Sequence, residues 1–111
     1  MKLPNAENAF IDDIKLTDYC LNPNHPVGKH KAKLFKNVLS ITRENYYLLK
    51  NIILEEILNN PAKKTLIDKF GKRYTVNIKL DKFRKKGFLV TAWIIRNEET
   101  FPRLTSCYIK K

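Results

Sequence analysis

The sequence predicts an α+β domain in which N-terminal helices pack on one face of a roughly four-stranded antiparallel sheet. Apolar residues recur with helical spacing up to about residue 60, whereas beyond Thr65 they alternate with polar residues, as in strands. The 111 residues, 43% of them hydrophobic, suffice for one core but not for two. We therefore expect a single domain over residues 1–111, with its helical part at about 11–60 and its sheet at about 63–110.

Three helices are expected in the first half of the chain, at about residues 17–22, 29–40 and 42–59. The first lies between a capping threonine and a proline, and a turn-rich segment, NPNHPVG, separates it from the second. Thr42 is the expected N-cap of the third helix. Four residues of this helix fall on one stripe that should face the core: Tyr46, Leu49, Ile53 and Ile57.

The second half should form an antiparallel meander. A hairpin is expected to turn near Gly71, and the strand after it sends alternate side chains to one buried face. These buried side chains are Tyr74, Val76, Ile78 and Leu80. The segment GFLVTAWIIR is apolar on both faces, which is typical of a central strand, and PRLTSCYIK supplies the last strand.

The chain is strongly basic, and its charge is uneven. Lys and Arg number 22 against 11 Asp and Glu, which gives a net charge of +11. Residues 24–40 carry four Lys and no acid, and residues 61–90 carry ten basic residues against Asp68 and Asp81. Such concentration favours a polyanionic partner, nucleic acid in particular. The alternative is that the charge serves only solubility or loose adhesion.

No motif for a cofactor, a metal or a membrane span is present. Cys20 and Cys107 form neither a metal-binding pair nor a disulfide framework, so we expect free thiols. The first residues, MKLPNAENAF, lack the apolar run of a signal peptide, and no segment reaches the length of a membrane span. We expect the chain to be cytoplasmic, or a fragment of a larger protein, and to need no cofactor.

The segment HPVGKHKAKLF, from His25 to Phe35, carries five basic or imidazole side chains and no carboxylate where the second helix should begin. Acidic residues are normally favoured there, because the unpaired N–H groups of a first turn carry partial positive charge. Gly28 would let a phosphate approach the backbone, and those N–H groups would then point at it. We therefore expect the segment to bind an anion, most naturally a phosphate of nucleic acid.

Lys31 has an unusual position on this helix. At about 100° per residue it points into the apolar face, between Leu34 and Phe35. The remaining lysines of the helix lie opposite: Lys29, Lys33 and Lys36. One explanation is that the Lys31 stem covers the core while its ammonium reaches water. The other is a partly buried ammonium facing a cleft, where it binds a phosphate or stabilises developing charge.

His25 lies in the turn before the helix, held between Asn24 and Pro26. An imidazole exchanges protons near neutral pH, so a rigid turn would present it as a general base or acid. The alternative is an ordinary surface histidine. A metal site at His25 and His30 is disfavoured, because no Cys, Asp or Glu lies nearby to complete it and the surrounding lysines repel cations.

The last strand offers further phosphate ligands. Regular alternation places Arg103, Thr105 and Cys107 on one face and Leu104, Ser106 and Tyr108 on the other. A guanidinium such as that of Arg103 binds a phosphate with two hydrogen bonds, and the hydroxyl of Thr105 or Tyr108 would donate a further one to the same phosphate. An edge strand with ordinary polar residues is the alternative. Trp93, with Thr91 on the same side of its strand, is a candidate for stacking a base, although a core Trp is more common.

Two segments carry a resemblance to a known family. KLTDYCLNPNHPVGKHKAKLF, followed after a helix by TAWIIRNEETFPRLTSCYI, resembles a family of small bacterial and phage-associated domains over nearly the whole chain. That family looks like the compact ribonuclease-toxin folds grouped with barnase, the EndoU nucleases, colicins D and E5 and the RelE toxins. The resemblance implies helices before an antiparallel sheet, and metal-independent RNA cleavage by a histidine, a basic residue and a hydroxyl or tyrosine around one phosphate.

Carried over by position, the resemblance implies that His25 is the general base or acid and Lys31 the transition-state cation. Arg103, Thr105 and Tyr108 would bind the phosphate from the sheet, and a bulge is needed for Thr105 and Tyr108 to face the same way. The expected catalytic side chains are thus His25, Lys31, Thr105 and Tyr108. The expected substrate-binding side chains are Lys29, His30, Thr91, Trp93, Arg103 and Ser106.

The function expected from the sequence is that of a metal-independent endoribonuclease, a toxin of a toxin–antitoxin or polymorphic toxin system. Its expected partners are RNA and an acidic antitoxin or immunity protein that covers the basic site, with no membrane involved. The alternative is a non-catalytic module that binds nucleic acid or protein, including a phage accessory domain. In that case the same charges serve only affinity.

Overall fold

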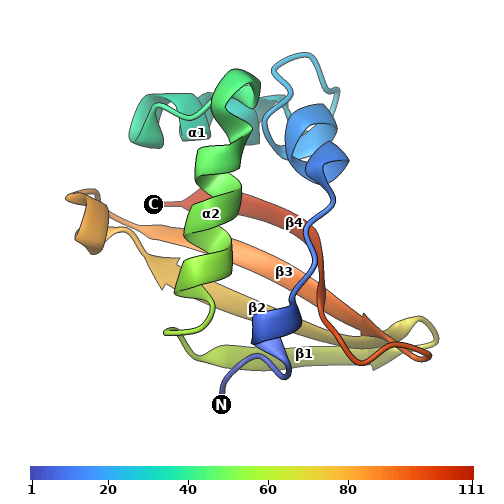
Figure 1. The fold of residues 1–111 in the computed structure, drawn as a ribbon. Coiled ribbons are helices and arrows are strands. Elements are labelled where there is room, and N and C mark those ends of the chain that lie inside the picture. The colour runs from blue at the N-terminus through green and yellow to red at the C-terminus, as the bar shows by residue number, and fades with distance from the viewer.

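The structure is a computed structural model that describes residues 1–111. It confirms the predicted α+β arrangement, with helices first and an antiparallel meander after them (Figure 1). The helical elements are η1 (Ala6–Asn8), η2 (Lys15–Cys20), α1 (Lys29–Leu39), η3 (Arg43–Asn45), α2 (Tyr46–Glu56) and η4 (Asp81–Phe83). The strands are β1 (Ala62–Asp68), β2 (Gly71–Lys79), β3 (Phe88–Arg96) and β4 (Arg103–Lys110). None of the helices has the length and apolar character needed to cross a bilayer.

The sheet has the strand order β1-β2-β3-β4, with every neighbouring pair antiparallel. The first hairpin turns where it was predicted, because Asp68 Oδ1 accepts the N–H groups of Phe70 and Gly71. Gly71 has φ +148°, and a side chain there would collide with the backbone of Ile95. The predicted turn is therefore confirmed, and its glycine is needed for both conformation and space.

The core lies between the sheet and the helical layer. Helix α2 crosses one face of the sheet (Figure 1), and its stripe of Leu49, Ile53 and Ile57 is buried as predicted, with Tyr46 half-buried. The sheet contributes the four predicted side chains of β2 and its extension: Tyr74, Val76, Ile78 and Leu80. Each such buried aliphatic side chain stabilises the fold by about 1.5–3 kcal/mol relative to exposure.

Two helical elements differ from their predicted form. The expected helix at 17–22 is the six-residue π-helix η2, which begins two residues earlier, at Lys15. Thr17 therefore lies within this helix rather than at its N-cap, and Asp12 Oδ1 accepts the backbone N–H of Ile14 just before it. The expected helix at 42–59 is shorter, because Thr42 and Asn45 form a capping box around the 3-10 turn η3 and α2 starts only after it.

Strand β4 contains a bulge at Thr105. Ala92 of β3 pairs with Ser106, but the next residue, Trp93, pairs with Leu104, so Thr105 is an extra residue in β4. The predicted regular alternation in this strand is therefore wrong. Leu104, Cys107 and Ile109 are buried together in the core. Ser106 and Tyr108 are more exposed and are paired with Ala92 and Val90, on the other face of the sheet.

The free edge of β4 is partly covered by the N-terminal half of the chain. Phe10 forms a parallel bridge with Arg103, in which Phe10 N donates to Pro102 O at 2.9 Å and Leu104 N donates to Phe10 O at 3.0 Å. Further along, η2 and α1 both pack against β4 (Figure 1). This packing brings the His25–Phe35 segment to the C-terminal strand, where the candidate site lies.

Candidate functional site

Lys31, on the first turn of α1, is half-buried and donates two hydrogen bonds: to Tyr19 Oη at 2.9 Å and to Ser106 Oγ at 3.0 Å. Its Nζ also lies 4.6 Å from the ring centre of Tyr19 and 5.5 Å from that of Tyr108. No carboxylate lies within 4.0 Å of it, since Lys31 takes part in none of the ion pairs of the chain. The structure thus supports the partly buried ammonium over the alternative in which the head group reaches free solvent.

Tyr19, at the C-terminal end of η2, is the site residue that the sequence did not reveal. Its hydroxyl oxygen accepts from Lys31, which leaves its own O–H free to donate. Its ring meets the imidazole of His25 edge-on, with the centroids 4.8 Å apart and the planes at 73°. Tyr19 therefore links the His25 turn to Lys31, by a contact between residues 12 positions apart that no local pattern encodes.

His25 has one ring nitrogen already occupied. Its Nδ1 accepts the backbone N–H of Val27 at 3.0 Å and that of Gly28 at 2.9 Å. Because backbone N–H groups only donate, the proton of the neutral imidazole is on Nε2. A base acting through Nε2 would need the other tautomer, whose Nδ1–H would face two N–H groups. The predicted role of general base or acid is therefore not supported, because both need a proton on Nδ1, and the geometry supports a hydrogen-bond donor instead.

The turn before α1 also differs from the predicted phosphate cradle. The N–H groups of Val27 and Gly28, just before the first turn, point at the imidazole of His25, and the N–H of Lys29 donates to the His25 carbonyl. Gly28 is buried, and a Cβ there would lie 2.5 Å from the backbone oxygen of Tyr19. The glycine therefore makes room for Tyr19, and the expectation that it admits a phosphate is corrected.

Together, five side chains form what we call the Lys31 cluster: Tyr19, His25, Lys31, Ser106 and Tyr108. Ser106 and Tyr108 lie two residues apart on one side of β4, and the bulge at Thr105 places this side opposite to the buried Leu104. Tyr108 is 37% exposed, so the cluster is open to solvent at this side. All five side chains carry N–H or O–H donors, which suits an oxyanion.

Arg103 is engaged within the protein. Its Nε and Nη2 donate to the two carboxylate oxygens of Glu99 at 2.8 and 2.7 Å, and its guanidinium lies about 5 Å from the rings of Phe10 (5.1 Å) and Phe101 (5.0 Å). The hydrogen bond from Arg103 lowers the pKa of Glu99, so the pair is ionised at neutral pH. The predicted phosphate clamp at Arg103 is therefore corrected, because its charge and its fork of donors are already paired.

Thr105 does not join the Lys31 cluster. It lines a separate small hollow of about 100 Å³ together with Phe10, Ile94 and Arg103. The assignment of both Thr105 and Tyr108 to one phosphate required a bulge, and β4 has one, but Ser106 rather than Thr105 contacts Lys31. The catalytic assignment of Thr105 is corrected, and the serine takes its place.

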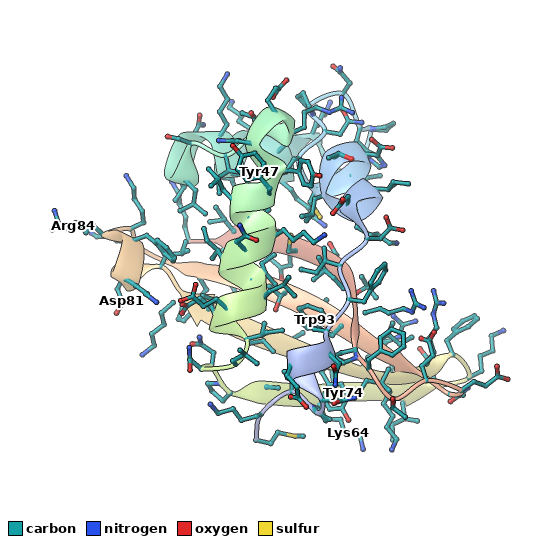
Figure 2. All side chains as sticks on the ribbon, viewed as in Figure 1. Tyr47, Lys64, Tyr74, Asp81, Arg84 and Trp93 are labelled. Atoms are coloured by element: carbon teal, nitrogen blue, oxygen red, sulfur yellow. The ribbon has the colours of Figure 1, made fainter.

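Thr91 and Trp93 lie in the core, with 0% and 1% of their surfaces exposed. Figure 2 shows Trp93 between the sheet and the helical layer. Thr91 Oγ1 donates to the Val76 carbonyl at 2.9 Å and accepts from the indole Nε1 at 2.8 Å. Both polar groups are satisfied internally, so the predicted stacking of a base on Trp93 is corrected.

Lys29 and His30 are exposed and lie on the other side of α1, as the helical positions of Lys29, Lys33 and Lys36 predicted. They line a groove of about 580 Å³, which we call the α1 groove. Its lining consists of Leu21, Pro23, Lys29, His30, Ala32, Lys33, Lys36, Thr42, Arg43 and Glu44. The structure thus separates Lys29 and His30 from Lys31.

Beneath the cluster lie the two thiols, Cys20 of η2 and Cys107 of β4, both fully buried and unbridged. A hydrogen bond from Cys107 lowers the pKa of the Cys20 thiol, and the positive charge of Lys31 lowers it further. The pKa of Cys107 is raised by the same neighbour and by burial. No three His, Cys, Asp or Glu side chains come together anywhere in the chain as they would around a metal ion.

A family model described as a domain of unknown function, DUF6883, matches residues 2–111. The chain belongs to the DUF6883 family. The match spans every helix and strand of the fold, including all five side chains of the Lys31 cluster. No curated protein and no solved structure matches the chain.

Proposed function

We propose that this DUF6883 domain is a metal-independent endoribonuclease whose scissile phosphate binds at the Lys31 cluster. One observation carries the proposal: a half-buried lysine has only neutral oxygens and aromatic rings around it and no carboxylate within ion-pair distance. A partly buried ammonium that is held by neutral hydroxyls and has no counter-ion favours the approach of an anion. The surrounding hydroxyls of Tyr19, Ser106 and Tyr108 add donors suited to phosphate oxygens.

In the proposed reaction the 2′-oxygen of the RNA attacks the adjacent phosphorus, and the bond from phosphorus to the 5′-oxygen breaks. The products are a 2′,3′-cyclic phosphate and a 5′-hydroxyl. Lys31, Tyr19 and Ser106 stabilise the negative charge that develops on the non-bridging oxygens. Tyr108 is our candidate for protonating the leaving oxygen, and the proton of the 2′-hydroxyl passes to water.

The same proposal makes the chain the toxic component of a toxin–antitoxin or polymorphic toxin system. The net charge of +11 supports it, because a ribonuclease that must be silenced needs a partner able to cover a basic site. That partner would be an acidic antitoxin or immunity protein. An inhibitor of this kind would hide the exposed Tyr108 side of the Lys31 cluster.

A non-catalytic RNA-binding module is the second candidate, and one observation favours it. Catalysis through the 2′-hydroxyl is faster with a positioned base, but Nδ1 of His25 is occupied and no carboxylate lies near Lys31. In such a module the Lys31 cluster binds a phosphate of the RNA, and the phosphodiester bond is not cleaved.

Incubation of the purified chain with a mixed-sequence RNA in the presence of EDTA tests the first proposal. We expect fragments ending in 2′,3′-cyclic phosphate and 5′-hydroxyl. Intact RNA, together with an affinity whose logarithm falls with log salt by about 0.7 per phosphate contacted, would support the binding module instead. Intact RNA and no salt-dependent binding would overturn both proposals.

A further inference from the structure

The α1 groove is the largest hollow described above and lies on the side of α1 away from Lys31. Its volume of about 580 Å³ falls within the range of about 300–1,000 Å³ typical of small-ligand sites. Three of its lining residues are apolar: Leu21, Pro23 and Ala32. Leu21 and Ala32 are almost fully buried, so the exposed Pro23 supplies most of the apolar surface that these three residues offer. Such a surface fits one face of a planar ring better than it fits a bare ion.

The rim of the groove is cationic. Lys29, Lys33 and Lys36 follow one another at helical spacing along α1, and Arg43 faces them from η3. The only carboxylate in the lining is Glu44, which accepts from Thr42 Oγ1 at 2.7 Å. Arg43 is partly engaged, at 3.3 Å from Asp18. Four cations against one carboxylate leave an excess of positive charge beside the apolar surface.

The groove adjoins the Lys31 cluster at the N-terminal end of α1. The turn between η2 and α1 contributes Pro23 to the groove and His25 to the cluster. Along α1, His30 lines the groove while the next residue, Lys31, belongs to the cluster. A chain molecule with a phosphate at Lys31 therefore reaches the groove by passing this turn.

We infer that the α1 groove binds a nucleoside phosphate, specifically a nucleotide of an RNA strand that also places a phosphate, more than one nucleotide away, at the Lys31 cluster. The base rests on Pro23, above the buried Leu21 and Ala32, and the phosphate lies against Lys33 and Lys36. The identity of the strand rests on the proposed function, whereas the chemistry of the groove does not. A free nucleotide has the same chemistry, so the experiment distinguishes the two sources.

The test compares the double variant Lys33→Gln/Lys36→Gln with a matched control, Lys64→Gln/Lys72→Gln. Glutamine keeps a polar side chain and a similar helix propensity while removing the charge. Lys64 and Lys72 are exposed and take part in no ion pair, and Lys64 lies at the β1 side of the molecule, away from α1 (Figure 2). Affinities are measured by fluorescence anisotropy for an octanucleotide and by calorimetry for a dinucleotide and for AMP.

We expect the groove variant to weaken octanucleotide binding about tenfold or more and to reduce its salt slope by about one to two, while the control changes it less than threefold. Dinucleotide binding, which needs only the Lys31 cluster, should be unchanged. Loss of AMP binding with unchanged octanucleotide binding supports the groove with a free nucleotide as its ligand. Groove and control variants that behave alike toward all three ligands overturn the inference.

The variant Lys31→Met separates this inference from the proposed function. If Lys31→Met cleaves RNA normally while the groove variant still weakens octanucleotide binding, the proposed function fails and the groove stands. If Lys31→Met stops cleavage while the groove variant matches its control, the groove fails and the proposed function stands.

Discussion

The Nζ of Lys31 and the Oγ of Ser106 lie 3.0 Å apart, although 75 positions separate the two residues in the chain. This hydrogen bond joins the first turn of α1 to β4, just past the bulge at Thr105. The ammonium is thereby held in one position among hydroxyls and rings, rather than sweeping through solvent as most lysines do. A fixed cation of this kind can stabilise developing negative charge on a phosphate without first changing its position.

Two variants of His25 test whether its imidazole donates a hydrogen bond or acts as a base. His25→Asn keeps an acceptor where Nδ1 lies and so keeps the turn, whereas His25→Gln keeps an N–H near the position of Nε2. If His25 acts as a hydrogen-bond donor, His25→Gln should cleave RNA faster than His25→Asn, which should lose about ten- to a hundredfold in cleavage rate. Equal losses of about 10²- to 10⁴-fold in both variants would identify a base and contradict our assignment.

Gly28→Ala should disturb the Lys31 cluster indirectly, by displacing Tyr19. The added methyl would lie 2.5 Å from the backbone oxygen of Tyr19 and 3.3 Å from its ring, so η2 must move. We expect a loss of about 1–3 kcal/mol in the free energy of unfolding and, because Tyr19 holds Lys31, about a hundredfold in cleavage rate. Urea denaturation and a rate assay measure both effects. Asn24→Ala in the same turn, at an exposed position, is the control and should change neither.

Thr91→Val tests whether Thr91 and Trp93 stabilise the core rather than bind RNA. The substitution leaves the indole N–H of Trp93 and the carbonyl of Val76 without their partner. We expect a loss of about 1–3 kcal/mol in the free energy of unfolding. Thr91→Ser keeps the hydroxyl and should retain that hydrogen bonding. RNA affinity, measured where each variant is folded, should be unchanged, and a specific loss of affinity would return these residues to the binding site.

The pair formed by Glu99 and Arg103 should make stability depend on pH in acid. The hydrogen bond from Arg103 holds the folded pKa of Glu99 below its ordinary 4.5. The unfolded chain therefore binds more protons between the two values, so the stabilisation is fully present above pH 4.5 and is lost as pH falls through the folded pKa. Urea unfolding should show wild type more stable than Glu99→Gln at pH 7, with the difference shrinking below pH 4.5. A difference constant with pH would contradict this account.

Much of the fold could be predicted because periodicity reports burial directly. Leu49, Ile53 and Ile57 recur at helical spacing and are buried, and the side chains of β2 alternate as a half-buried strand requires. The bulge in β4 entered only as a condition for Thr105 and Tyr108 to face the same way, although the sequence contains a sign of its position. The buried residues Leu104, Cys107 and Ile109 are spaced by three and then two, which regular alternation forbids.

The candidate site was predicted less well, because its geometry depends on tertiary contacts. Lys31 could be found, since a lysine on an apolar helix face conflicts with burial. Tyr19 could not, because only the packing of η2 against α1 brings it to Lys31. Arg103 was assigned to a phosphate although Glu99, four residues earlier, offered a nearer partner. The proton position on His25 follows from the backbone conformation of a turn that no residue pattern specifies.

The cleavage rate of Lys31→Met at saturating RNA, compared with that of Lys64→Met, tests the central claim most directly. Methionine fills the space between the rings of Tyr19 and Tyr108 without a charge, and Lys64 is an exposed lysine away from the site. Saturation removes differences in binding, so the rate reports the chemical step. We predict that Lys31→Met, folded as wild type by circular dichroism, loses about 10²- to 10³-fold and that Lys64→Met loses nothing. Cleavage by Lys31→Met at the wild-type rate would contradict the account.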